Sequence, residues 1–179
     1  MNYVYIATSL DGYIATNEGS LDWLTSLPTP TDSDYGYSVF LQNIDAIVMG
    51  KNTFETVSKF TPWPYEKPVF VLSSGLRSIP EALKKHVSLV SGNIPNLLSQ
   101  LHEKGFKTLY IDGGKTIQSF LELDLIDEMT ITRVPILLGK GIPLFKESTR
   151  IKQFTHIKTE VFDNGLVMST YRKRKSDTL

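Results

Sequence analysis

Two adjacent glycines at the end of an apolar run carry the clearest chemical signal in this sequence. Lys107–Asp112 reads as a strand, Gly113 and Gly114 follow it, and Lys115 and Thr116 open a segment with helical apolar spacing. Glycines let a backbone approach a bound group closely. A helix start offers free N–H groups and the positive end of the helix dipole, and Lys115 adds a full charge. The pattern favours a bound phosphate, although taken alone it also describes a plain tight turn.

Small, hydroxyl and basic residues follow three other buried runs as well. In an open parallel sheet, ligands bind beyond the carboxyl ends of the strands. Four polar strand ends together therefore indicate an extended ligand with several phosphates. The four groups are Gly50-Lys51-Asn52-Thr53, Ser73-Ser74-Gly75-Leu76-Arg77, Ser91-Gly92 and Gly113-Gly114-Lys115-Thr116.

The elements that position these groups alternate between strand and helix. Apolar runs predict strands at Val4–Thr8, Asp45–Met49, Pro68–Leu72, Val87–Val90, Lys107–Asp112 and Glu128–Val134. Helical spacing predicts helices at Asp34–Asn43, Asn52–Lys59, Ile94–Lys104 and Thr116–Leu123. Asp163-Asn164-Gly165 joins the last two expected strands, His156–Phe162 and Leu166–Arg172, as a hairpin. The order predicts an α/β fold with a mostly parallel central sheet, helices on both faces and a C-terminal antiparallel hairpin.

Composition narrows the class of protein. A chain of 179 residues with 41% apolar and 21% charged residues predicts one globular domain spanning residues 1–179. Lys plus Arg and Asp plus Glu both number 19, so no global charge recruits nucleic acid or a membrane surface. The absence of cysteine excludes disulfides, thiol catalysis and thiolate zinc sites, and no spacing suggests a metal site. No signal-like start or membrane-length apolar run is present, so we expect a cytoplasmic protein.

The motifs, in this order and spacing, resemble the dihydrofolate reductase fold and, within it, the C-terminal domain of the riboflavin-biosynthesis reductase. The resemblance covers residues 3–172 and rests on residues 9–15, 45–55, 68–73, 111–116, 125–128 and 135–141. It implies an NADPH-dependent oxidoreductase that transfers hydride to a small heterocyclic or carbonyl substrate. The named relative of that kind reduces 5-amino-6-(5-phosphoribosylamino)uracil.

The resemblance also implies how NADPH is held. Ala7 and Ile14 match residues whose backbone holds the nicotinamide carboxamide. Gly50, Lys51 and Thr53 match a Gly-Arg-x-Thr motif at the pyrophosphate and adenosine, with Lys51 where arginine is usual.

Two further groups complete the implied cofactor site. Ser73 and Ser74, with Arg77 nearby, match the 2′-phosphate site. The pyrophosphate turn, which in this fold usually contains a cis Gly–Gly peptide, is matched by Gly113, Gly114, Lys115 and Thr116.

The substrate side is less well defined by the sequence. Asp34 and Asp32 both lie near the position of the acid that contacts substrate in dihydrofolate reductase, and helix capping explains either one equally. Thr132 aligns with a substrate-binding threonine, and ordinary strand polarity explains it as well. The loop Asp11–Leu27 is expected to close over the nicotinamide, with Trp23 as its anchor or as ordinary core.

Two further expectations concern activity and assembly. A non-catalytic nucleotide-binding or regulatory module that keeps the cofactor cleft is the alternative to a reductase. The apolar segment Pro135–Phe145 needs a cover, so we expect a homodimer, with packing of this segment inside one chain as the alternative.

Overall fold

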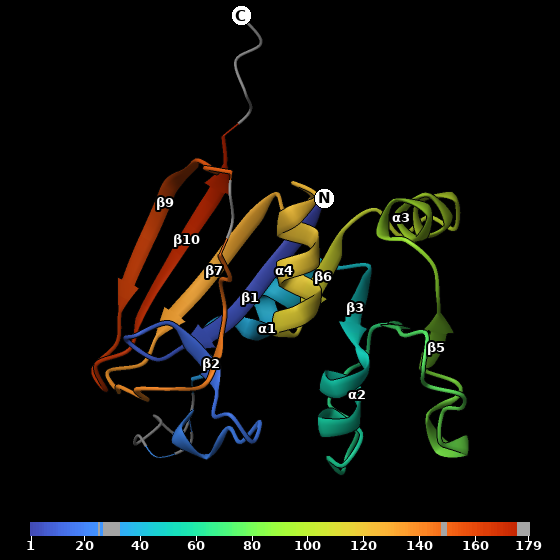
Figure 1. The fold of residues 1–179 in the computed structure, drawn as a ribbon, viewed down its shortest axis with the longest axis horizontal. Helices are drawn as coiled ribbons and strands as arrows, with labels where there is room; N and C mark the ends of the chain where they lie inside the picture. The colour runs from blue at the N-terminus through green and yellow to red at the C-terminus, as the bar shows by residue number, and fades with distance from the viewer. Residues whose placement is uncertain (25, 27–32, 148–149, 175–179) are drawn as a thin grey trace, which may run out of the picture.

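The structure, a computed structural model, describes residues 1–24, 26, 33–147 and 150–174. Its sheet has eight strands in the order β5-β4-β3-β6-β1-β7-β10-β9 (Figure 1). Neighbouring strands from β5 to β7 are parallel, and β10 is antiparallel to both β7 and β9. The predicted α/β fold is confirmed. The strands are β1 (Asn2–Thr8), β3 (Ala46–Gly50), β4 (Val69–Leu72), β5 (Val87–Val90), β6 (Leu109–Asp112), β7 (Glu128–Arg133), β9 (Phe154–Val161) and β10 (Val167–Lys173).

Helices cover both faces of this sheet. On one face, α3 (Ile94–Glu103) and α4 (Gly114–Glu122) bury their apolar stripes. On the other face, α2 (Lys51–Val57) buries its apolar residues and α1 (Tyr37–Gln42) packs partly buried ones against the core. Two short 3₁₀ turns, η1 (Asp22–Leu24) and η2 (Glu81–Leu83), lie in the connections. Each face therefore has its own core.

Strand β3 shows why the sheet needs both layers. Ala46 and Val48 pack into the core under α3 and α4, whereas Ile47 and Met49 pack into the core under α1 and α2. All four side chains are fully buried. A strand with no polar alternation can only be stable when both of its faces are covered, as in parallel α/β sheets.

A two-stranded sheet, β2 (Tyr13–Ala15) paired with β8 (Ile142–Pro143), is the element that the sequence did not predict. Its strands are too short to show alternation. Gly141 is required here because a Cβ at this position would run into the carbonyl oxygen of Ala15. The pair brings the segment 135–145 onto the loop that follows β1, and Leu144 is fully buried as a result.

Helix α1 begins later than predicted, at Tyr37 instead of Asp34. Tyr35 and Gly36 both have positive φ, 56° and 86°, which places them in a turn and outside the helix. Trp23, in η1, is buried against Val134 and Leu166 and so anchors the preceding loop to β7 and β10.

Candidate functional site

One cleft of about 960 Å³ crosses the carboxyl ends of β1, β6, β3 and β4. This is the edge of a parallel sheet where ligands bind. The sequence-predicted cofactor residues line it, with one exception, Arg77. Those in its wall are Ala7, Ile14, Gly50, Lys51, Thr53, Ser73, Ser74, Gly113, Gly114, Lys115 and Thr116.

Two strand-to-helix turns meet at the centre of this cleft. A Cβ added to Gly50, before α2, would lie 2.9 Å from Oγ1 of Thr116 in α4. A Cβ added to Gly113, before α4, would overlap Oγ1 of Thr53 in α2. The glycine before each helix thus lies against the threonine in the first turn of the other helix. Without side chains at these glycines, the starts of both helices come together on one wall.

These helix starts have the properties of an anion site. Neither α2 nor α4 has a side-chain N-cap, so their first N–H groups are not satisfied by a capping side chain. Lys51 and Lys115 each occupy the first turn and are exposed. Lys51 Nζ lies 3.6 Å from the Glu55 carboxylate, an exposed pair that a phosphate can outcompete. The arrangement suits a pyrophosphate.

The peptide between Gly113 and Gly114 differs from what the resemblance implies. Among the described residues only Thr61–Pro62 is cis, so the Gly–Gly peptide is trans. Gly113 has φ 88°, a conformation that favours glycine. Gly114 is buried, and a Cβ there would lie 2.5 Å from Cδ1 of Ile14.

The two serines that follow β4 line the cleft, whereas Arg77, which was predicted to lie with them, does not. Ser73 Oγ accepts hydrogen bonds from the N–H groups of Gly75 (3.1 Å) and Leu76 (3.0 Å), which fixes the turn. Ser74 is exposed in the cleft wall, whereas Arg77 is exposed outside it.

The loop between β1 and β2 is fixed by a carboxylate clamp. Asp11 accepts hydrogen bonds from the N–H of Gly139 (2.7 Å), the N–H of Leu138 (3.2 Å) and the Ser9 hydroxyl (2.5 Å). These bonds, that from Ser9 above all, lower the pKa of Asp11. Asp11 therefore holds the wall that carries Ile14 instead of facing a substrate.

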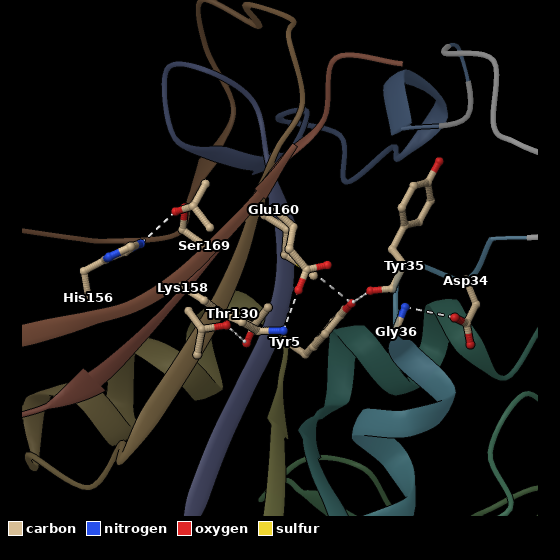
Figure 2. A network of polar contacts seen from close by, with 12 residues as sticks. Tyr5, Asp34, Tyr35, Gly36, Thr130, His156, Lys158, Glu160 and Ser169 are labelled. Carbon is tan, nitrogen blue, oxygen red and sulfur yellow. Dashed lines mark hydrogen bonds and ion pairs between the residues drawn. The ribbon is translucent and has the colours of Figure 1, made fainter. Parts of the chain in front are cut away.

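The structure does not bring the predicted substrate-side residues together. Asp34 is exposed outside the cleft wall. Its carboxylate accepts hydrogen bonds from the N–H of Gly36 at 2.9 Å (Figure 2) and from the N–H of Ser38 at 2.8 Å. Hydrogen bonds, chiefly from the Ser38 side chain, lower its pKa. Thr132 is buried in β7, paired with Ala7, and also lies outside the wall. Asp32 lies outside the described residues.

A different carboxyl group, Asp112, lies in the cleft. It ends β6 directly before the glycines, is half-buried, and accepts from the N–H of Gly113 (2.8 Å) and the hydroxyl of Tyr65 (3.4 Å). Burial raises the pKa of the Asp112 carboxyl by more than its hydrogen bonds lower it. Sequence reasoning used this residue only as part of a motif. The available signal was an acid at a strand end next to a predicted ligand turn.

Tyrosines surround this carboxyl group. The Tyr110 hydroxyl donates to the carbonyl of Tyr5 at 3.0 Å, and both residues line the cleft with Tyr65. Burial, followed by the charge of Asp112, raises the pKa of Tyr65 and Tyr110. Burial, followed by the charges of Asp34 and Glu160, raises the pKa of Tyr5 to about 12. These hydroxyls are neutral hydrogen-bonding groups at ordinary pH.

The model of the RibD C-terminal domain matches residues 3–168. The chain belongs to the RibD C-terminal domain family. YwjB of Bacillus subtilis (strain 168) is 37% identical over 149 residues, which cover 82% of this chain and 83% of that protein. The RibD protein of Aquifex aeolicus is 25% identical over 171 residues, and the match covers 77% of this chain and 47% of that longer protein.

Solved structures agree with this membership. The crystal structure of a putative riboflavin biosynthesis protein from Shewanella sp. PV-4 has a TM-score of 0.93 at 50% identity, covering 97% of this chain and 99% of that one. The deaminase/5-amino-6-(5-phosphoribosylamino)uracil reductase of Thermotoga maritima has a TM-score of 0.73 at 14% identity, covering 97% and 56%. The latter shows that the fold is shared with a RibD reductase domain.

The described residues also bear on metal binding and on membrane insertion. They contain no group of three His, Asp or Glu side chains placed to hold a metal ion. None of the helices in the described part of this RibD C-terminal domain is long and apolar enough to cross a bilayer.

Proposed function

We propose that the protein is an NADPH-dependent oxidoreductase that reduces a small ring or carbonyl compound. One observation carries the proposal: two uncapped helix starts with lysines share a cleft with a half-buried carboxyl group of raised pKa. The first feature suits a dinucleotide phosphate, and the second suits proton transfer. Membership of a family that includes reductases supports the combination.

The residues of the wall fit NADPH in kind and position. The turns at Gly50 and Gly113–Gly114 would hold the pyrophosphate, with Lys51 and Lys115 supplying charge. Ser74 would contact the adenosine 2′-phosphate. Ile14 on β2, which lies next to Gly114, and Ala7 on β1 would border the nicotinamide, as the family resemblance implies.

NADPH, when bound, supplies hydride, so the protein's part is to orient the substrate, exclude water and supply a proton. Three carboxyl side chains occur among the described residues that line the cleft. Glu18 and Glu55 are exposed, whereas Asp112 is half-buried with a raised pKa. Asp112 would therefore hold the proton that the reduced substrate takes up, and Tyr65 would orient its carboxyl group.

The segment 21–24, which contains η1, would exclude water from the reacting groups. Leu21 and Leu24 line the cleft on either side of Trp23, whose burial fixes η1. Apolar side chains at this place lower the local dielectric constant and strengthen the electrostatic interactions inside.

NADPH oxidation followed at its own absorbance, with pterins, pyrimidines and small carbonyl compounds as acceptors, tests this function. Turnover with any of them, lost when Asp112 is changed to Asn, supports the reductase. A regulatory module is favoured if NADPH binds but no acceptor is reduced. That alternative has one structural observation in its favour, because Asp34 lies outside the cleft wall.

A further inference from the structure

The charges of this chain are distributed very unevenly along its sequence. Residues 1–50 contain no Lys, Arg or His, and Lys51 is the first basic side chain. The same fifty residues contain six acidic side chains. These are Asp11, Glu18, Asp22, Asp32, Asp34 and Asp45.

Those fifty residues supply part of the cleft wall. We call Tyr5, Leu24, Tyr65, Tyr110 and Asp112 the ring side, and all five line the cleft. The stretch without cations supplies two of them, together with the neighbouring Ala7, Leu21 and Glu18. The rest of the ring side comes from tyrosines and one acid. It is therefore lined by aromatic, apolar and acidic groups.

The charged side chains near Tyr5 are mainly acidic, so the electrostatic potential there is negative. Its hydroxyl donates to the carbonyl of Tyr35 at 2.6 Å, beside the turn that Asp34 closes, and Glu160 of β9 lies on its other side (Figure 2). Lys158 is nearby, but its Nζ lies 2.5 Å from the Glu160 carboxylate and it is outside the cleft wall. A phosphate placed between Tyr5 and Asp112, which both line the cleft, would be partly desolvated beside the Asp112 carboxyl group, which is costly.

The basic residues of the cleft lie mainly at the helix starts that are assigned to the cofactor phosphates, and not on the ring side. Among the described residues in its wall, three are basic: Lys51, Lys59 and Lys115. Lys51 and Lys115 stand at the two helix starts assigned to the cofactor. Lys59 lies beyond the end of α2 and is exposed, so it offers at most one solvated charge. Phosphate sites normally combine several donors.

We propose that the ring side takes a planar, uncharged ring that carries no phosphate group. The claim rests on the proposed function, because it assigns the lysine side to NADPH. It separates this chain from the Thermotoga reductase, whose name specifies a phosphoribosyl substrate. Contact with Tyr5 and Leu24, which are partly exposed in the wall, and hydrogen bonds to Asp112 are the interactions that such a ring would find.

Matched pairs of rings test the inference by binding, without any need for turnover. The pairs are uridine with uridine 5′-phosphate and riboflavin with flavin mononucleotide, titrated calorimetrically with saturating NADP⁺ and again without it. NADP⁺ blocks the lysine side, so a phosphate cannot be held there. We expect the member without phosphate to bind at least as tightly as its partner. Binding of the phosphorylated member about tenfold tighter, or no binding of any ring, would overturn the proposal.

Two variants sharpen the comparison. Leu21→Lys places a cation on this exposed position of the wall and should improve binding of the phosphorylated members severalfold. Lys59→Ala should change neither member of a pair; a selective loss for the phosphorylated members would show that Lys59 anchors a phosphate and would contradict the inference. Failure of the proposed reductase function would be recognised separately: NADP⁺ would not bind, or NADPH would not be oxidised. The ratio of the affinities within each pair of ring compounds could still be measured in that case.

Discussion

Gly113 and Thr53 lie against each other in the wall of the cleft, so closely that a single methyl group on the glycine would overlap the threonine hydroxyl. Gly50 and Thr116 repeat the relationship in the opposite sense, at 2.9 Å. Because both glycines precede helix starts, the two contacts set the distance between α2 and α4. The shape of the proposed phosphate site therefore depends on residues that have no side chain.

Replacing Gly114 with Val should abolish NADPH binding while the protein remains folded. A Cβ there would lie 2.5 Å from Cδ1 of Ile14, a residue of the cleft wall, so the larger side chain would displace Ile14. Isothermal titration with NADPH and circular dichroism check the two parts. Gly75→Val is the matched control, since its Cβ meets no atom within 4 Å and should leave affinity unchanged. Undiminished affinity in Gly114→Val would place the ligand elsewhere.

Asp112→Asn should lower kcat for NADPH oxidation by about 100- to 10,000-fold, the usual contribution of a general acid. The Kd for NADPH should stay unchanged because Asp112 is assigned to proton transfer. Asp34→Asn is the comparison, since that carboxylate lies outside the cleft wall. Loss of turnover in Asp34→Asn with retention in Asp112→Asn would reverse the assignment.

The same substitution should change the pH dependence of stability. Burial raises the pKa of Asp112 in the folded protein above its unfolded value, so the folded state binds the proton more tightly. Stability is thus lost as pH rises from about 3.9, the unfolded value, through the raised folded pKa. Asp112→Asn, which never ionises, should have a higher Tm than the parent at neutral pH and a similar Tm near pH 4. A lower Tm at neutral pH would contradict the raised pKa.

NADPH should raise the Tm more than NADH does. Ser74 lies in the wall where the adenosine end is assigned, and a 2′-phosphate adds charge-assisted hydrogen bonds to such a group. Ser74→Ala should weaken NADPH by about tenfold, equivalent to roughly 1.4 kcal/mol, and leave NADH nearly unaffected, whereas Lys51→Ala, at the proposed pyrophosphate site, should weaken both cofactors. Arg77→Ala is the control because Arg77 lies outside the wall. Equal Tm shifts with both cofactors would remove the 2′-phosphate assignment.

The sequence predicts the sheet well because fully buried strands and turn glycines are local signals. Val48 and Met49 indicate a buried strand in any context, and Gly113 indicates a turn. Asp34 and Asp112 show where such reasoning fails. Both are acids next to a glycine-containing turn, and only the contacts of β6 with Tyr65 and Tyr5 determine that one is half-buried in the cleft and the other exposed. Burial of that kind depends on contacts between residues far apart in the chain.

We also expect two copies to pair, although through a different surface from the one that the sequence suggested. Segment 135–145 is partly covered within the chain, while β9 is an exposed sheet edge along seven of its eight residues. In an antiparallel pairing centred on Thr159, Lys158 would face Glu160 of the second copy, and Ile157 would face its Val161. Ile157 and Val161 are 44% and 73% exposed.

Light scattering tests this pairing. We expect twice the chain mass of 20.2 kDa, and Ile157→Lys should restore the single-chain mass. Leu137→Lys, in the segment first expected to pair, should leave the assembly intact. A mass of one chain at every concentration would exclude the dimer.

A crystal structure of the protein with NADPH tests the account most directly. It should show the pyrophosphate at the Gly113–Gly114 turn, between Lys51 and Lys115, and the nicotinamide bordered by Ala7 and Ile14, with Asp112 facing the space beside it. NADPH bound outside this cleft, or bound with the nicotinamide directed away from Asp112, would contradict the account.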